Sequence, residues 1–303
     1  MKTKNIIKLL IMSIFSLIIL CSCSFDYSLL EDYLYEDTNS NFTANSDNFT
    51  VHYLDVGQGD SIFIELPDSQ TMLIDAADKN YGEGIVEYIN DCGYSQIDYL
   101  IATHPHADHI GSMSYVVDNM NISSIYMPKV STTTKTYENL LTSIADKGLK
   151  IKSTTAGMNI VDENGLIVEA VAPVTIDENN LNNCSIVLKI TYGSTSFLFT
   201  GDAEMEELES ITSDISADVL KVGHHGSDTS TNEEFLWSVN PSIAVISVGE
   251  GNDYDHPHKS TMNYLQDFGC EIYRTDEDNT ITITSDGENL TVNTHGSSIE
   301  KGD

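Results

Sequence analysis

The sequence predicts an α/β fold in which two β-sheets carry helices on their outer faces. Three features indicate it: many short apolar runs rich in β-branched residues, fewer amphipathic segments between them, and two halves of similar character. With 303 residues, 40% of them hydrophobic, the chain can bury a sizeable core without a disulfide framework. Neither a linker nor an internal repeat interrupts residues 49–292, so we expect one domain there.

The first half of this domain is expected to open with three strands. They cover residues 49–54, 61–66 and 71–74, and turn-forming residues separate them at Gly57, Gly59 and Pro67. Four more elements follow: a helix over 84–90, a short buried strand over 99–102, a strand over 125–127, and an amphipathic helix over 137–147.

The second half repeats this style. A strand over 166–171 is expected to pair with the segment before it through a turn at 162–165, and a hairpin is expected to join 185–191 to 195–200. Further strands are predicted over 219–222, 243–246 and 281–283, with helices over 204–211, 235–239 and 261–268. Residues 293–303 are expected to form a polar tail.

The N-terminal 22 residues are predicted to be a targeting signal rather than part of the fold. Lysines precede an apolar run over 6–20 that is too short to span a bilayer comfortably. The run ends in Leu20-Cys21-Ser22-Cys23, which resembles the lipobox of bacterial lipoproteins and implies lipidation of Cys23. The protein is then expected on the extracytoplasmic face of a bacterial cell membrane, with residues 23–48 as a flexible tether. A plain secretory signal is the alternative.

The charge balance disfavours a broad nucleic-acid-binding face. Formal net charge is −33, and Arg274 is the one arginine in the sequence. Phosphate binding depends on Lys and Arg, which release the counterions of the nucleic acid. Cys92, Cys184 and Cys270 are widely spaced and odd in number, so we expect buried free thiols rather than disulfides.

Residues 103–109, THPHADH, carry the ligand spacing of a two-metal site. His104 and His106 can face one cation from a loop after a strand, and Asp108 and His109 can reach a second. Imidazole and carboxylate suit zinc, and mixed sites also hold manganese or iron. A chance cluster is disfavoured because three of the nine histidines fall in these few residues. The motif predicts a metal-dependent hydrolase.

This motif resembles that of the metallo-β-lactamase superfamily, and other segments extend the resemblance. They are 54–60 (LDVGQGD), 73–75 (LID), 182–188 (NNCSIVL), 200–204 (TGDAE), 220–227 (LKVGHHGS) and 252–257 (NDYDHP). Over about 49–285 they resemble the soluble hydrolase domain of ComEC-like DNA-uptake proteins and their stand-alone relatives. The resemblance implies the αββα four-layer sandwich, with the metals at one edge between the sheets.

The resemblance also implies roles for single residues. Asp202 resembles the carboxylate that bridges two metals, and Asp75 resembles the aspartate that supports the metal loop by hydrogen bonds. His224 or His225 resembles the last metal ligand, and the other of the two would orient a ligand or contact substrate. Asp60 is either a turn residue or a neighbour of the site.

One departure weakens the first metal site. The superfamily usually supplies a third histidine before the bridging aspartate, yet the sequence has none between His109 and His224. Asn182, Asn183 and Ser185 stand where it would be expected, and Asn183 is assigned a supporting role. One or two Zn²⁺ ions are expected, with Mn²⁺ as a possibility.

A second departure is Asp255, where the family often has Gly before His-Pro. The next residue, His256, still fits as a substrate or transition-state contact, and its alternative is a helix-entry residue. Lys221 either neutralises a phosphate or stands on an edge strand. We assign Asp108, His256 and Lys221 to catalysis.

The leading hypothesis is a phosphodiesterase in which metal-bound hydroxide attacks phosphorus. Its substrate would be a small-molecule or cell-wall phosphodiester; nucleic acid is implied by the resemblance but disfavoured by the charge. Two alternatives stay open: hydrolysis of a carboxylic ester, lactone or lactam on the same metals, and a lipoprotein that binds without catalysis.

Overall fold

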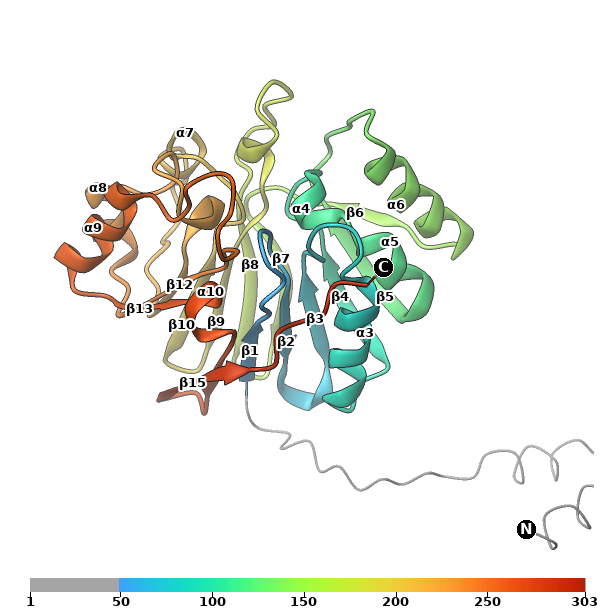
Figure 1. Ribbon diagram of the computed structural model, residues 1–303, viewed down its shortest axis with the longest axis horizontal. Coiled ribbons are helices and arrows are strands. Elements are labelled where there is room, and N and C mark those ends of the chain that lie inside the picture. The colour runs from blue at the N-terminus through green and yellow to red at the C-terminus, as the bar shows by residue number, and fades with distance from the viewer. Residues whose placement is uncertain (1–48, 303) are drawn as a thin grey trace, which may run out of the picture. The chain divides into compact units, whose positions relative to one another are not determined.

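Two β-sheets lie face to face in the computed structural model, which describes residues 49–302 (Figure 1). The first sheet has the strand order β15 (Leu290–Gly296), β14 (Thr280–Ser285), β1 (Phe49–Tyr53), β2 (Ile62–Glu65), β3 (Thr71–Ile74), β4 (Gln96–Ile101), β5 (Asn121–Met127) and β6 (Ile151–Ser153). The second has the order β13 (Glu271–Arg274), β12 (Ile243–Ile246), β11 (Val219–Lys221), β10 (Thr195–Phe199), β9 (Val187–Tyr192), β8 (Leu166–Ala172) and β7 (Met158–Glu163).

Helices cover the outer face of each sheet (Figure 1). The first sheet carries α3 (Gly82–Asp91), α5 (Met113–Asn119) and α6 (Lys135–Asp146). The second carries α7 (Met205–Leu208), α8 (Glu233–Val239) and α9 (Lys259–Phe268). The short helices α4 (Ala107–Ile110) and α10 (Thr275–Asp278) lie in connections. The predicted αββα four-layer sandwich is therefore confirmed.

Period-two alternation along the strands builds three hydrophobic layers. In β3, Met72 and Ile74 face the central layer between the sheets, whereas Leu73 faces the helices. Aromatic rings fill the central layer, and the centroids of Phe49 and Phe197 lie 5.0 Å apart across it. Because each face of each sheet is covered, both sheets are fixed on two sides.

The observed elements extend the predicted ones in several places. Each predicted strand is present, but the predicted helix over 204–211 ends at Leu208. The additional elements are β6, β13, β15, α4, α5 and α10. β15 runs to Gly296, and the amide of the buried Ile299 donates to the Asp55 carbonyl at 2.9 Å. The ordered chain thus continues past residue 292, where the domain was expected to end.

Other expectations are resolved only in part. The signal, the tether and Cys23 lie outside the described residues. Within residues 49–302 no helix combines the length and apolar character needed to cross a membrane. Cys184 is a buried free thiol as expected, whereas Cys92 and Cys270 are free but only partly buried.

The parallel strands of both sheets deliver polar residues to one edge of the sandwich. β3 pairs in parallel with β4, and β10 pairs in parallel with β11. Asp75 directly follows β3, His104 follows β4, Asp202 follows β10, and His225 follows β11. Since parallel strands end at the same edge, residues far apart in sequence meet there.

Candidate metal centre

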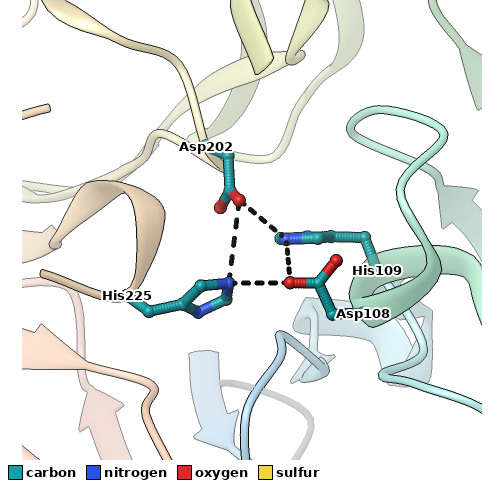
Figure 2. Close-up of side chains that lie close together, drawn as sticks. All are labelled: Asp108, His109, Asp202 and His225. Carbon is teal, nitrogen blue, oxygen red and sulfur yellow. Dashed lines mark ion pairs between the residues drawn. The ribbon is translucent and has the colours of Figure 1, made fainter. Parts of the chain in front are cut away.

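Four side chains from three connections converge at this edge of the sandwich (Figure 2). Asp108 and His109 lie in α4, Asp202 follows β10, and His225 lies in a 3₁₀ turn, η3 (Gly223–Gly226). One ligand atom from each residue can be chosen so that all four lie within 4.8 Å of one another. We refer to Asp108, His109, Asp202 and His225 as the metal cluster.

The spacing of the metal cluster suits one divalent cation. His109 Nε2 is 3.2 Å from Asp202 Oδ2, and His225 Nε2 is 3.3 Å from Asp108 Oδ2 and 3.7 Å from Asp202 Oδ2. Nitrogen and oxygen ligands about 2.0–2.2 Å from a shared zinc ion lie roughly 3–4 Å from one another.

Hydrogen bonds from Nδ1 of His109 and of His225 orient the two rings so that the Nε2 lone pairs point into the metal cluster. His109 Nδ1 donates to Asp75 Oδ2 at 2.7 Å, and His225 Nδ1 donates to the Ser247 carbonyl at 3.0 Å. The remaining Nε2 atom of each ring is buried and makes no hydrogen bond, and neither does Asp202 Oδ1. Unpaired buried polar atoms are costly and rare. Two of them, His109 Nε2 and His225 Nε2, face the same oxygen, Asp202 Oδ2, and this arrangement fits a cation, so these residues can hold one.

The pKa shifts reflect a strongly negative pocket. Burial lowers the pKa of His225, but Asp202, Asp108 and Asp60 outweigh it and raise that pKa to about 10. Burial opposes ionisation of Asp108, yet His109 and His225 hold its pKa below the usual range. Protons and a divalent cation therefore compete for the same lone pairs.

Asp75 orients the metal cluster from behind. Its Oδ1 accepts the Thr103 amide at 2.8 Å, and its Oδ2 accepts the Thr103 hydroxyl at 2.6 Å as well as His109 Nδ1. Burial raises the pKa of Asp75, while His109 and Thr103 oppose that rise. These bonds tie Asp75 to Thr103 and His109, and its supporting role toward a metal stays a prediction.

Asp75→Asn is expected to weaken Zn²⁺ binding by roughly 10- to 100-fold, because the amide cannot accept from both His109 and Thr103 as an anion does. A zinc titration of the purified protein measures it. Asp98→Asn is the matched control, since Asp98 Oδ2 accepts the Thr71 amide at 2.9 Å on β4 away from the metal cluster. Equal losses in both variants would contradict a specific role for Asp75.

His104 and His106 lie next to the metal cluster but outside it. His104 is fully buried, and its Nε2 is 3.0 Å from His106 Nδ1 and 3.9 Å from Asp202 Oδ2. Ser185 stands near the position of the absent third histidine, where its Oγ accepts the Asp202 amide at 3.1 Å. Asn183 Oδ1 accepts the Glu204 amide at 3.0 Å. The latter two contacts hold the loop that carries Asp202.

A cavity of about 300 Å³ opens onto the metal cluster. Its lining includes Gln58, His106, Asn182, His224, Tyr254 and His256 beside residues of the metal cluster. The rings of Tyr254 and His256 stack with centroids 5.6 Å apart. Burial, together with the neighbouring histidines, lowers the pKa of His256 to about 4, so its ring is neutral at pH 7. His256 therefore lines the cavity beside the metal cluster, and its contact with a substrate stays a prediction.

Lys221 does not lie in this cavity. Its side chain is fully buried, and Nζ donates to Asp60 Oδ2 at 2.8 Å and to the Val222 carbonyl at 3.1 Å. A buried, paired ammonium is not available to a substrate phosphate, so the expected phosphate contact is not supported by its position. Asp60, whose role was open, lies behind the metal cluster with Oδ1 3.4 Å from His225 Nδ1.

The comparisons with known proteins agree with this fold. Residues 54–250 match the family model of the metallo-β-lactamase superfamily. The chain belongs to this superfamily.

Among curated proteins, the chain is 33% identical over 251 residues to ComE operon protein 3 of Bacillus subtilis (strain 168), covering 76% of this chain and 32% of that protein. It is 29% identical over 231 residues to Recombination protein 2 of Haemophilus influenzae, covering 74% of this chain and 27% of that protein. It therefore spans about a third or less of these relatives. The solved structure of CmlA, a diiron β-hydroxylase from Streptomyces venezuelae, has a TM-score of 0.50 at 17% identity and shares the fold over 75% of this chain and 52% of its own.

Proposed function

We propose that this superfamily hydrolase is a metal-dependent phosphodiesterase. The observation that carries the proposal is the metal cluster of two carboxylates and two imidazoles, with unpaired lone pairs, at the floor of an open cavity. A divalent cation bound there would lower the pKa of a water molecule and polarise a phosphoryl oxygen. The neutral His256 ring in the cavity wall can donate an N–H to a second phosphoryl oxygen.

Composition and relationship narrow the substrate class. The absence of a histidine between His109 and His224 disfavours an efficient lactamase, and one relative is named Recombination protein 2. A net charge of −33 disfavours long nucleic acid. A small-molecule or cell-wall phosphodiester, encountered outside the cytoplasmic membrane, fits best with both the missing histidine and the negative net charge. We also propose that a lipid on Cys23 anchors the protein to the membrane. A Cys23→Ala protein that stays in the membrane fraction would contradict this anchoring.

Hydrolysis of bis-p-nitrophenyl phosphate with added Mn²⁺ or Zn²⁺ tests the reaction. We expect turnover that Asp108→Ala removes and that Asp118→Ala, at an exposed position of α5, retains. Parallel assays use single-stranded DNA and the lactam nitrocefin. Turnover of nitrocefin alone, or no phosphodiester cleavage above the Asp108→Ala background with either metal, would overturn the proposal.

A further inference from the structure

The rim of the cavity beside the metal cluster carries an exposed aromatic ring. Tyr254 lines this cavity, yet it is 64% exposed. Its ring stacks on that of His256, with the centroids 5.6 Å apart and an interplanar angle of 26°. An aromatic ring that is supported on one side and largely open to solvent can bind a cation or a planar group through its π face.

Asn252 fixes the loop that presents this ring. Its Nδ2 donates to the carbonyls of Gly249 at 3.0 Å and His256 at 2.7 Å. Its Oδ1 accepts the amides of Tyr254 and His256, each at 3.1 Å. Between these two residues, Asp255 has a left-handed backbone with φ 59°. Four hydrogen bonds to one side chain hold this short loop, so the position of Tyr254 is set before a substrate arrives.

The loop around the ring is negatively charged. Glu250, Asp253 and Asp255 lie in it, and all three are exposed. The nearest lysine in the sequence, Lys259, begins α9, and no ion pair among the described residues involves any of the three carboxylates. Within the described chain, the cavity lining contains neither lysine nor arginine. The mouth of the cavity therefore attracts cations and repels anions.

The metal cluster and this rim favour opposite charges on one substrate. A divalent cation in the metal cluster would attract phosphoryl oxygens, whereas the acidic loop disfavours further negative charge. A nucleobase could stack on Tyr254 but brings no positive charge, and an oligonucleotide adds phosphates. A diester that carries an ammonium group a few bonds from its phosphate satisfies both features. Such a substrate also reconciles phosphodiester hydrolysis with a net charge of −33.

We propose that Tyr254 is a specificity-determining residue that binds the alkylammonium group of a zwitterionic phosphodiester. This inference rests on the proposed phosphodiesterase function and names its substrate class, a phosphodiester of an amino alcohol. The ring supplies a cation–π contact, and the carboxylates of Asp253 and Asp255 add to the attraction. In the hydrolysis, water forms the new bond to phosphorus, one ester bond between phosphorus and oxygen breaks, and the released alcohol takes up the proton that water loses.

Three diesters that release p-nitrophenol test this assignment on the full chain with added Mn²⁺ or Zn²⁺. The second ester group is cationic in p-nitrophenylphosphorylcholine and has the same shape without charge in p-nitrophenyl neohexyl phosphate. It carries a nucleobase in the p-nitrophenyl ester of thymidine monophosphate. We expect the KM for the choline ester to be about 5- to 30-fold lower than that for the neohexyl ester. Tyr254→Leu should remove this difference, and Tyr254→Phe, which keeps the ring, should retain it.

Tyr264→Leu is the matched control for Tyr254→Leu. Tyr264 is 39% exposed on α9 and does not line the cavity, so this variant should keep the wild-type KM for both esters. Metal content is measured for each protein, because Tyr254→Leu should change the KM for the choline ester without changing the metal bound. A calorimetric titration with phosphocholine and with neohexyl phosphate measures the same preference without turnover.

Equal KM values and equal affinities for the charged and uncharged ligands would overturn the inference and leave the phosphodiesterase proposal standing. A Tyr254→Leu protein with the full preference would do the same. A preference for the thymidine ester that depends on Tyr254 would replace the ammonium group with a nucleobase. If no diester is turned over, the phosphodiesterase proposal fails, and the calorimetric preference for phosphocholine still decides whether Tyr254 binds the ammonium group.

Discussion

Asp202→Asn is expected to abolish tight metal binding and to lower kcat/KM for bis-p-nitrophenyl phosphate by on the order of 10³-fold. The carboxylate is 2% exposed, and its Oδ2 lies within 3.9 Å of an Nε2 atom in each of four histidines. Asparagine keeps the size of the side chain but removes the negative charge that the histidines and a cation share. Metal content and steady-state kinetics of the purified variant measure both effects.

Asp218→Asn provides the matched control for this change. Asp218 also adjoins a strand of the second sheet, where its Oδ2 accepts the Ser196 amide and hydroxyl, each at 2.8 Å. Asp218→Asn should lower the stability of the protein without changing its metal content. An Asp202→Asn protein that retains both metal and activity would show that this residue is not the shared ligand of the centre.

The success of the fold prediction follows from burial. Strands with one or two buried faces, such as β1 and β3, leave an apolar pattern in the sequence, and these were predicted within a residue or two. β6 is exposed at all of its positions, and β15 is partly or fully exposed throughout. Both are edge strands of the first sheet, where few side chains are buried: of β15, only Leu290 and Val292 pack against the central layer, and they are half-buried. That is why the domain boundary was placed too early.

The residues of the candidate site could likewise be predicted only in part from the sequence. His104, His106, Asp108 and His109 are contiguous and stand out without a structure, whereas Asp202 was found through resemblance. The choice between His224 and His225 depends on two left-handed residues in η3, which the letters Gly-His-His-Gly do not specify. The structure brings His225 into the metal cluster and leaves His224 beside it.

The ion-pair partner of Lys221 could not be predicted, because the two residues lie far apart in the sequence. The sequence predicted a strand here and offered an edge position for Lys221, but β11 lies inside the second sheet. Its partner Asp60 lies 161 positions away. The structure therefore changes the prediction for this residue from catalysis to stability. Lys221→Met is expected to lower the free energy of unfolding by about 3–5 kcal/mol, because it leaves a buried carboxylate without its cation. Urea denaturation of the metal-free protein at pH 7 measures it.

The matched control is Lys135→Met, at an exposed ion pair whose Nζ lies 3.5 Å from Glu138 Oε2. That change should alter stability by no more than about 0.5 kcal/mol, since exposed pairs contribute little. The double variant Asp60→Asn/Lys221→Met removes both charges and should recover much of the loss. If Lys221→Met were as mild as Lys135→Met, the pair would not be a structural requirement. A free Lys221 would then again be a candidate for substrate binding.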